Sequence, residues 1–136
     1  MRLYRIFLTL VLLLIHGTLQ AQFTLTIEVK DLRSNAGQLL LQFFDENHNN
    51  LKGVIASIED NKSIIEIKDL KPGKYAFRYF HDENSNDEFD VNWMGIPKEG
   101  FGFSNNATGV FRSPAFDKWL FELRENIQMI CNPRYL

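Results

Sequence analysis

Residues 74–80 read Lys-Tyr-Ala-Phe-Arg-Tyr-Phe, and this stretch decides the fold because it is the clearest strand in the sequence. Its aromatic side chains recur at every second position, so Tyr75, Phe77 and Tyr79 would share one face of a strand. The turn-forming residues Lys71-Pro72-Gly73 come directly before it. The pattern predicts a β-hairpin whose second strand delivers the following loop to one end of a β domain.

Strand patterns also occur on the N-terminal side of this stretch. Residues 23–29 alternate apolar with polar side chains, as a half-buried strand does. Residues 38–44 are apolar enough for a central strand, and residues 63–67 form another strand that Leu70 closes. A polar loop and the short apolar run 54–56 separate these two strands.

The strands predicted for residues 118–131 complete the evidence for the fold class. Residues 118–123 and 126–131 are predicted to be two further strands, joined at Arg124-Glu125. A helix over residues 116–129 is the alternative, because Leu, Glu and Lys are frequent there. We expect an all-β domain, an antiparallel β-sandwich of about seven strands.

Residues 1–21 have the parts of a secretory signal peptide. Arg2 and Arg5 supply positive charge, an apolar run of about ten residues follows, and Ala21 precedes a plausible cleavage position. The apolar run is about half as long as a membrane span requires. We expect a secreted or periplasmic protein with no membrane span after cleavage, and a single domain over residues 22–136.

Composition narrows the classes of partner. The net charge is −2, so the chain has no basic excess of the kind that binds nucleic acid. Cys131 is the only cysteine, which excludes an internal disulfide framework in an exported domain. Cys131 lies in an apolar run and is interpreted as a packed side chain.

The loop after residue 80 is rich in side chains that carry oxygen atoms. Residues 81–90 read His-Asp-Glu-Asn-Ser-Asn-Asp-Glu-Phe-Asp and contain five acidic side chains without a Lys or Arg. Hard cations such as Ca²⁺ prefer six to eight oxygen ligands, and calcium loops supply them from alternate residues. The candidate ligands of a Ca²⁺ ion are Asp82, Asn84, Asn86, Glu88 and Asp90.

The spacing differs from that of an EF-hand. Asp87 occupies the sixth position, where the EF-hand has Gly, and Trp93 occupies the twelfth, where it has Glu. No amphipathic helix flanks the loop. A shorter calcium turn between strands fits the residues, and a solvated acidic loop is the alternative because Asn, Asp and Ser are ordinary turn residues.

A segment that mixes glycine with aromatic residues follows the acidic loop. It runs from residue 93 to residue 106 and has no regular periodicity, which is typical of a structured functional loop. The alternative is a packed loop whose aromatic rings plug the end of the core. The candidate ligand or partner surface comprises His81, Trp93, Phe101, Phe103, Ser104, Asn105 and Asn106.

Three functions are compatible with these patterns. The first is a binding module whose Ca²⁺-stabilised acidic loop orders the glycine-aromatic segment. The second is a structural envelope domain that presents Trp93, Phe101 and Phe103 to an envelope protein or a glycan. The third is a hydrolase that uses His81 with Asp82 or Asp90, although the sequence has no G-x-S-x-G or H-E-x-x-H motif to support it.

Three motifs, residues 69–76, 81–86 and 95–106, resemble a known family in their order and spacing. The family is DUF2141, a group of uncharacterised bacterial proteins, and the similarity spans nearly all of residues 22–136. The resemblance implies an exported β-sandwich of the transthyretin-like or carboxypeptidase-regulatory-like type, and it says more about fold and export than about function. The chain departs from the family at Asp87, where Gly is more usual, so the geometry of a calcium turn is open at that position.

Overall fold

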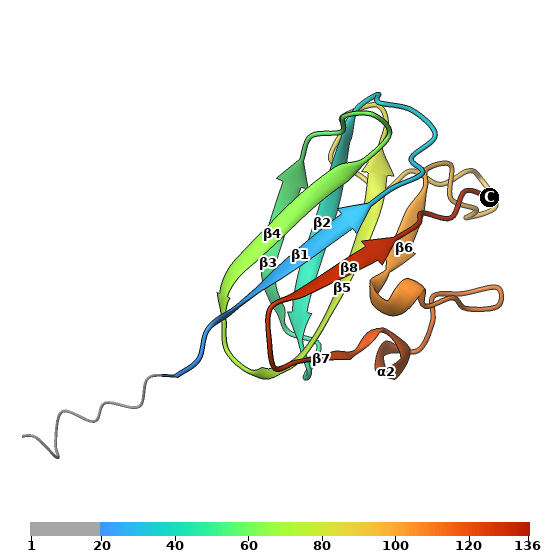
Figure 1. The fold of residues 1–136 in the computed structure, drawn as a ribbon. Coiled ribbons are helices and arrows are strands. Elements are labelled where there is room, and N and C mark those ends of the chain that lie inside the picture. The colour runs from blue at the N-terminus through green and yellow to red at the C-terminus, as the bar shows by residue number, and fades with distance from the viewer. Residues whose placement is uncertain (1–19) are drawn as a thin grey trace, which may run out of the picture.

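The computed structural model describes residues 20–136 and shows two β-sheets packed face to face (Figure 1). The smaller sheet has the order β4-β1-β8, formed by Ser63–Leu70, Phe23–Val29 and Ile127–Cys131. The larger sheet has the order β3-β2-β5-β6, formed by Asn50–Ala56, Gln38–Asp45, Gly73–Asp82 and Phe101–Phe103, and β7 (Phe121–Leu123) pairs with the start of β5. The predicted all-β sandwich is confirmed.

The predicted signal peptide, residues 1–21, falls almost entirely outside the described residues. From residue 20 onward, no helix has the length and apolar character that a membrane crossing would require.

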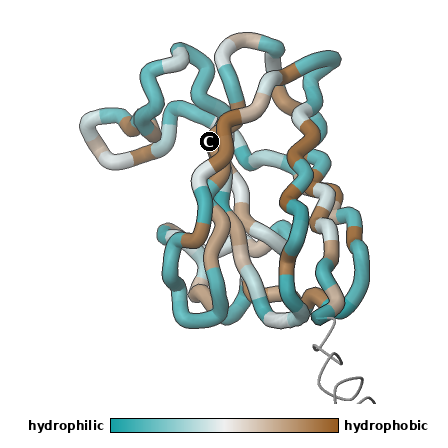
Figure 2. Tube along the Cα trace, turned by 90° about the vertical axis from the view of Figure 1, so that its left-hand side faces the viewer, coloured by the Kyte–Doolittle hydropathy of each residue, from teal (hydrophilic) through white to brown (hydrophobic). Residues whose placement is uncertain are grey.

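The core lies between the two sheets and follows the alternation of the sequence. Leu25, Ile27 and Val29 of β1 are fully buried, and Phe43 and Phe77 meet them from the larger sheet. Hydropathy alternates along the strands for the same reason, since every second residue faces the opposite sheet (Figure 2). Tyr75, Phe77 and Tyr79 share the inner face, as their spacing predicts.

The predicted hairpin around Pro72 is wrong. β4 pairs with β1, whereas β5 pairs with β2, so the turn carries the chain from one sheet to the other. The physical reason is that β5 buries residues on both of its faces, for example Ala76 and Phe77, and therefore occupies the middle of the larger sheet.

The C-terminal segment also differs from the expected pair of neighbouring strands. A short helix, α2 (Phe116–Trp119), precedes β7, and the chain then crosses to the smaller sheet. β8 arrives beside β1 in the same direction, so this one pair is parallel and the other pairs are antiparallel among the described strands. The helix that was the alternative over residues 116–129 is present for one turn only.

The outer face of the larger sheet is only partly covered. At one end, Phe44 and Ala76 pack against Trp119 of α2 and Phe103 of β6 in a second apolar cluster. Ser104, in the short 3-10 helix η1 (Ser104–Asn106), fixes this cover: its hydroxyl donates to Trp119 O at 2.5 Å and accepts from Phe77 N at 3.0 Å. The other end of the same face has no such cover.

Gly37 provides a test of how the turn before β2 meets β5. It adopts φ +73°, and a Cβ atom there would lie 1.9 Å from the main-chain oxygen of Asp82. Gly37→Ala should lower the free energy of unfolding by about 3 kcal/mol, because it adds left-handed strain to a backbone clash.

Gly53→Ala is the matched control for urea denaturation. Gly53 lies on the edge strand β3, and its Cβ would meet nothing within 4 Å. We expect a change below about 0.5 kcal/mol. Equal midpoints for the two variants would contradict the packing of Gly37 on β5.

Candidate functional site

Asp82 is the anchor of the acidic loop. It is the last residue of β5 and is 0 % exposed, so its carboxylate must be satisfied by protein donors. The backbone N–H groups of Asn86 and Asp87 donate to it at 3.1 and 3.0 Å, and Gln38 Nε2 donates at 2.9 Å. These three bonds fold the chain back over the end of β5.

The loop turns sharply because two of its residues adopt left-handed backbone angles. Ser85 has φ +56° and Asp87 has φ +62°. Asp87 therefore takes a left-handed conformation that favours Gly, and its carboxylate accepts a hydrogen bond from Gln38 Nε2 at 2.6 Å. The bend that a calcium turn needs is present without a glycine.

Three of the five predicted calcium ligands are brought together. The Nδ2 atom of Asn84 donates to Asp90 at 2.7 Å, and that of Asn86 donates to the same carboxylate at 3.2 Å. Asp82 lies beneath them, at the base of the loop, and Glu88 is exposed. Within residues 20–136, no three His, Cys, Asp or Glu side chains are grouped closely enough to hold a metal, so the Ca²⁺ site stays a prediction.

Glu99 is a carboxylate of this region that the sequence analysis missed. It is 4 % exposed, and its two oxygens accept hydrogen bonds from the backbone N–H groups of Glu83 and Asp90, each at 3.1 Å. Burial raises the pKa of Glu99, and the negative charges of Asp90 and Asp82 raise it further. A pattern of alternate oxygens cannot reveal it, because it lies nine positions after Asp90 in the sequence.

An ion pair closes the base of the loop from outside. Arg33 Nη2 donates to Glu83 at 2.9 Å and to the main-chain oxygen of Lys98 at 3.1 Å, so one guanidinium joins both ends of the segment. The hydrogen bond from Arg33, supported by its positive charge, holds the pKa of Glu83 below its ordinary value. The segment 83–99 is therefore pinned by Asp82, Glu99 and Arg33.

His81 does not belong to an open surface. It is 0 % exposed in β5, its Nε2 atom lies 2.7 Å from Ala36 O, and its Nδ1 atom lies 2.9 Å from the hydroxyl of Tyr135. Because the carbonyl can only accept, Nε2 carries a proton, and Nδ1 is paired with the hydroxyl of Tyr135. Both nitrogens are occupied, so this arrangement lends no support to a hydrolytic role and indicates a structural one.

The second half of the segment forms a small hairpin of its own. Lys98 N donates to Asp90 O at 2.9 Å, and the side chain of Asn92 accepts from the N–H groups of Met94 and Ile96. The tip of this hairpin presents Trp93, which is 92 % exposed. Hydrogen bonds thus hold an apolar tip out in water.

The uncovered part of the larger sheet is a groove of about 1320 Å³. Its floor contains Leu40 of β2, Phe80 of β5, and Phe101 and Phe103 of β6, which lie on the outer face. The hairpin of residues 89–97 forms one wall, and the loop of residues 107–114 between η1 and α2, which projects from the sandwich in Figure 1, forms the other.

The remaining residues of the predicted ligand or partner surface lie in different environments. Phe101 is half-buried in the groove floor, whereas Phe103 is 7 % exposed and packs its ring 4.7 Å from that of Trp119. Ser104 is fully buried. Asn105 Nδ2 donates to Leu120 O at 2.9 Å, and Asn106, which lines the groove, accepts a hydrogen bond from Asn132 N.

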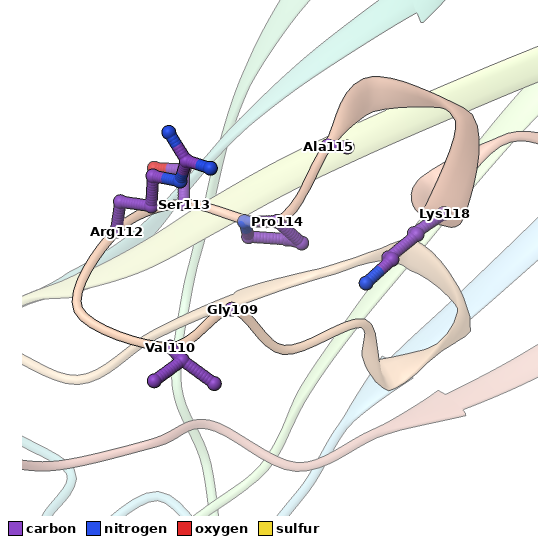
Figure 3. Close-up of a pocket in the computed structure, with 7 residues that line it drawn as sticks. All are labelled: Gly109, Val110, Arg112, Ser113, Pro114, Ala115 and Lys118. Carbon is purple, nitrogen blue, oxygen red and sulfur yellow. The ribbon is translucent and has the colours of Figure 1, made fainter.

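A smaller hollow of about 540 Å³ lies behind the projecting loop and shares residues with the groove (Figure 3). Gly109 allows this loop to close tightly, because a Cβ there would meet the main-chain oxygen of Arg112 at 2.1 Å. Lys118 extends from α2 toward Gly109 across the hollow (Figure 3). The loop is therefore bordered by positive charge.

The lowered pKa of Glu83 predicts that its contribution to the stability of the fold depends on pH. A carboxyl whose folded pKa is lowered stabilises the fold above its ordinary pKa near 4.5, and it loses that contribution as the pH falls through the folded value. Glu83→Gln should therefore be less stable than the parent near pH 6, and the two should converge below about pH 3.

Urea denaturation between these pH values measures the difference. Glu122→Gln is the control, because its pair with Arg124 is exposed and should contribute little at any pH. A parent-to-variant difference that stays constant across the range would show that Arg33 does not shift Glu83.

The comparisons with known proteins concern the family alone. A family described as "Uncharacterized protein conserved in bacteria (DUF2141)" matches residues 27–130, which is more than half of the chain. No curated protein and no solved structure gives a significant match. The matched range runs from β1 to β8 and includes the acidic loop, the hairpin and both walls of the groove. The chain belongs to the DUF2141 family.

Proposed function

We propose that this domain is an exported binding module whose ligand surface is the groove on the outer face of the larger sheet. The observation that carries the proposal is the concentration of exposed apolar residues there. Of the twelve large hydrophobic residues that are exposed between residues 20 and 136, seven line the groove. These seven are Phe89, Val91, Met94, Ile96, Val110, Phe111 and Leu136.

Exposing this many neighbouring apolar side chains to water is unfavourable unless a ligand or a partner covers them. Soluble domains expose hydrophobic side chains singly, and contiguous apolar surface is typical of a binding site. Phe111 supports this interpretation, because it is fully exposed and also has φ +63°, a strained angle for a bulky residue. A ligand that buries Phe111 would remove the unfavourable exposure of its ring to water and would offset the strain of its backbone.

Calcium has a definite role in the proposal. Burial raises the pKa of Glu99, the negative charges of Asp90 and Asp82 raise it further, and a cation bound by the loop would relieve this repulsion. The Nδ2 atoms of Asn84 and Asn86 now face Asp90, and a turn of each amide would present its oxygen instead. Bound Ca²⁺ would stiffen the segment 83–99 and with it one wall of the groove.

A structural envelope domain is the second candidate function. Trp93 favours it, because a 92 % exposed tryptophan at the tip of a hydrogen-bonded hairpin can anchor on a protein or a glycan. Phe103 cannot contribute in this conformation, since it is buried. Trp93 lies outside the groove lining, so the two functions can be separated by substitution.

The calcium role predicts a change in thermal stability. A ligand that binds only the folded state raises the unfolding midpoint, and extracellular calcium modules bind in the range of about 10⁻⁴ to 10⁻³ M. About 10 mM Ca²⁺ should therefore raise the midpoint by about 5 °C over the value in EDTA.

Asp90→Asn should abolish this rise, whereas Asp117→Asn, outside the loop, should preserve it. Asp90 is the better substitution because its carboxylate receives only the two Asn side chains among the described contacts. An unchanged midpoint for the parent protein over millimolar Ca²⁺ would remove calcium from the proposal.

The groove predicts that the protein binds an uncharged apolar probe. Nile red should bind with increased fluorescence, and Phe111→Ser should weaken binding about fivefold or more, since burial of one large apolar side chain contributes about 1.5–3 kcal/mol. Ile55→Ser is the matched control, because Ile55 is 61 % exposed on β3 and does not line the groove. Equal loss in both variants, or no binding by the parent, would contradict the groove as a ligand site.

A further inference from the structure

We propose that the ligand of the groove is a free long-chain carboxylic acid, held by its apolar chain on the aromatic floor and by its carboxylate among arginines. This inference rests on the proposed function and names the class of ligand. The charge of the lining motivates it. The chain has more acidic than basic residues, yet Arg78, Arg112 and Arg134 line the groove and no Asp or Glu side chain does.

These arginines are available to a ligand. Within residues 20–136 none of the three forms an ion pair, and no acidic side chain in the lining offsets their charge. Arg78 donates to Gln42 at 2.7 Å through Nε, which leaves its terminal nitrogens for another acceptor. A guanidinium binds a carboxylate through two parallel hydrogen bonds, a geometry that suits an acid better than an alcohol.

The floor suits an extended apolar chain. The rings of Phe80, Phe89 and Phe101 follow one another with centroids 5.3 and 5.8 Å apart, which makes a continuous aromatic track. Met94 and Ile96 on one wall and Val110 and Phe111 on the other flank it. Dispersion and burial along such a track grow with chain length.

A peptide fits the same groove less well. Peptides bind β domains by adding a strand to a free sheet edge. Here β6 is the edge strand at the groove, and Phe101 exchanges two backbone hydrogen bonds with Arg134, at 3.0 and 2.8 Å. The C-terminal segment thus occupies the backbone groups that a peptide would use, whereas an acyl chain needs none.

The test compares ligands that differ only in the head group. Isothermal titration at low salt should show that dodecanoate binds at least about tenfold more tightly than dodecan-1-ol, and about 0.5 M NaCl should remove most of the difference. The variant with Arg78→Gln, Arg112→Gln and Arg134→Gln should lose the preference and retain Nile red binding. Arg124→Gln, at an exposed turn away from the groove, is the control for the loss of an arginine outside the groove and should retain the preference.

Each other outcome overturns a different statement. Equal binding of acid and alcohol, with Nile red still bound, overturns the carboxylic acid and leaves the binding groove. Binding to phosphatidylglycerol vesicles without binding of free dodecanoate identifies a lipid surface instead and also overturns it. Failure of every probe, Nile red included, overturns the proposed function itself.

Discussion

A buried carboxylate at the end of the longest strand is the constraint on which the rest of the structure depends. Asp82 has no exposed surface, and its charge is compensated by two backbone N–H groups and by Gln38. Removing the carboxylate would leave those donors without a partner, each at a cost of about 1–3 kcal/mol. Glu99 repeats the arrangement at the other end of the segment, so residues 83–99 are held by two internal acids.

The segment matters because it separates two surfaces of opposite character. On its inner side, Asp82, Asp90 and Glu99 gather negative charge around a sharp bend. Its second half forms one wall of a groove whose other charges are arginines and whose floor is aromatic. The same hydrogen bonds therefore shape a candidate cation site and a candidate ligand groove, and an ion bound in the first would stiffen the second.

The sequence predicts the strands well where a single physical pattern dominates. Alternation identified β1 and β5 because one face of each packs into the core. It could not show that the Pro72 turn crosses between sheets, since pairing depends on burial of both faces of β5. It placed Asp82 and His81 in the loop after residue 80 and not in a buried strand, because acidic residues are rarely buried, and only tertiary contacts show what compensates them. Glu99 and the arginine lining of the groove come from segments far apart in the chain, which no local motif joins.

Amide hydrogen exchange in EDTA tests the central claim most directly, namely that buried carboxylates hold the acidic loop without help from a metal. The N–H groups of Asn86 and Asp87 donate to Asp82, and those of Glu83 and Asp90 donate to Glu99. We expect these four amides to exchange at least about tenfold more slowly than that of Val110 in the projecting loop, after correction for intrinsic rates. Exchange of all four as fast as that of Val110 would show that the carboxylates do not brace the loop.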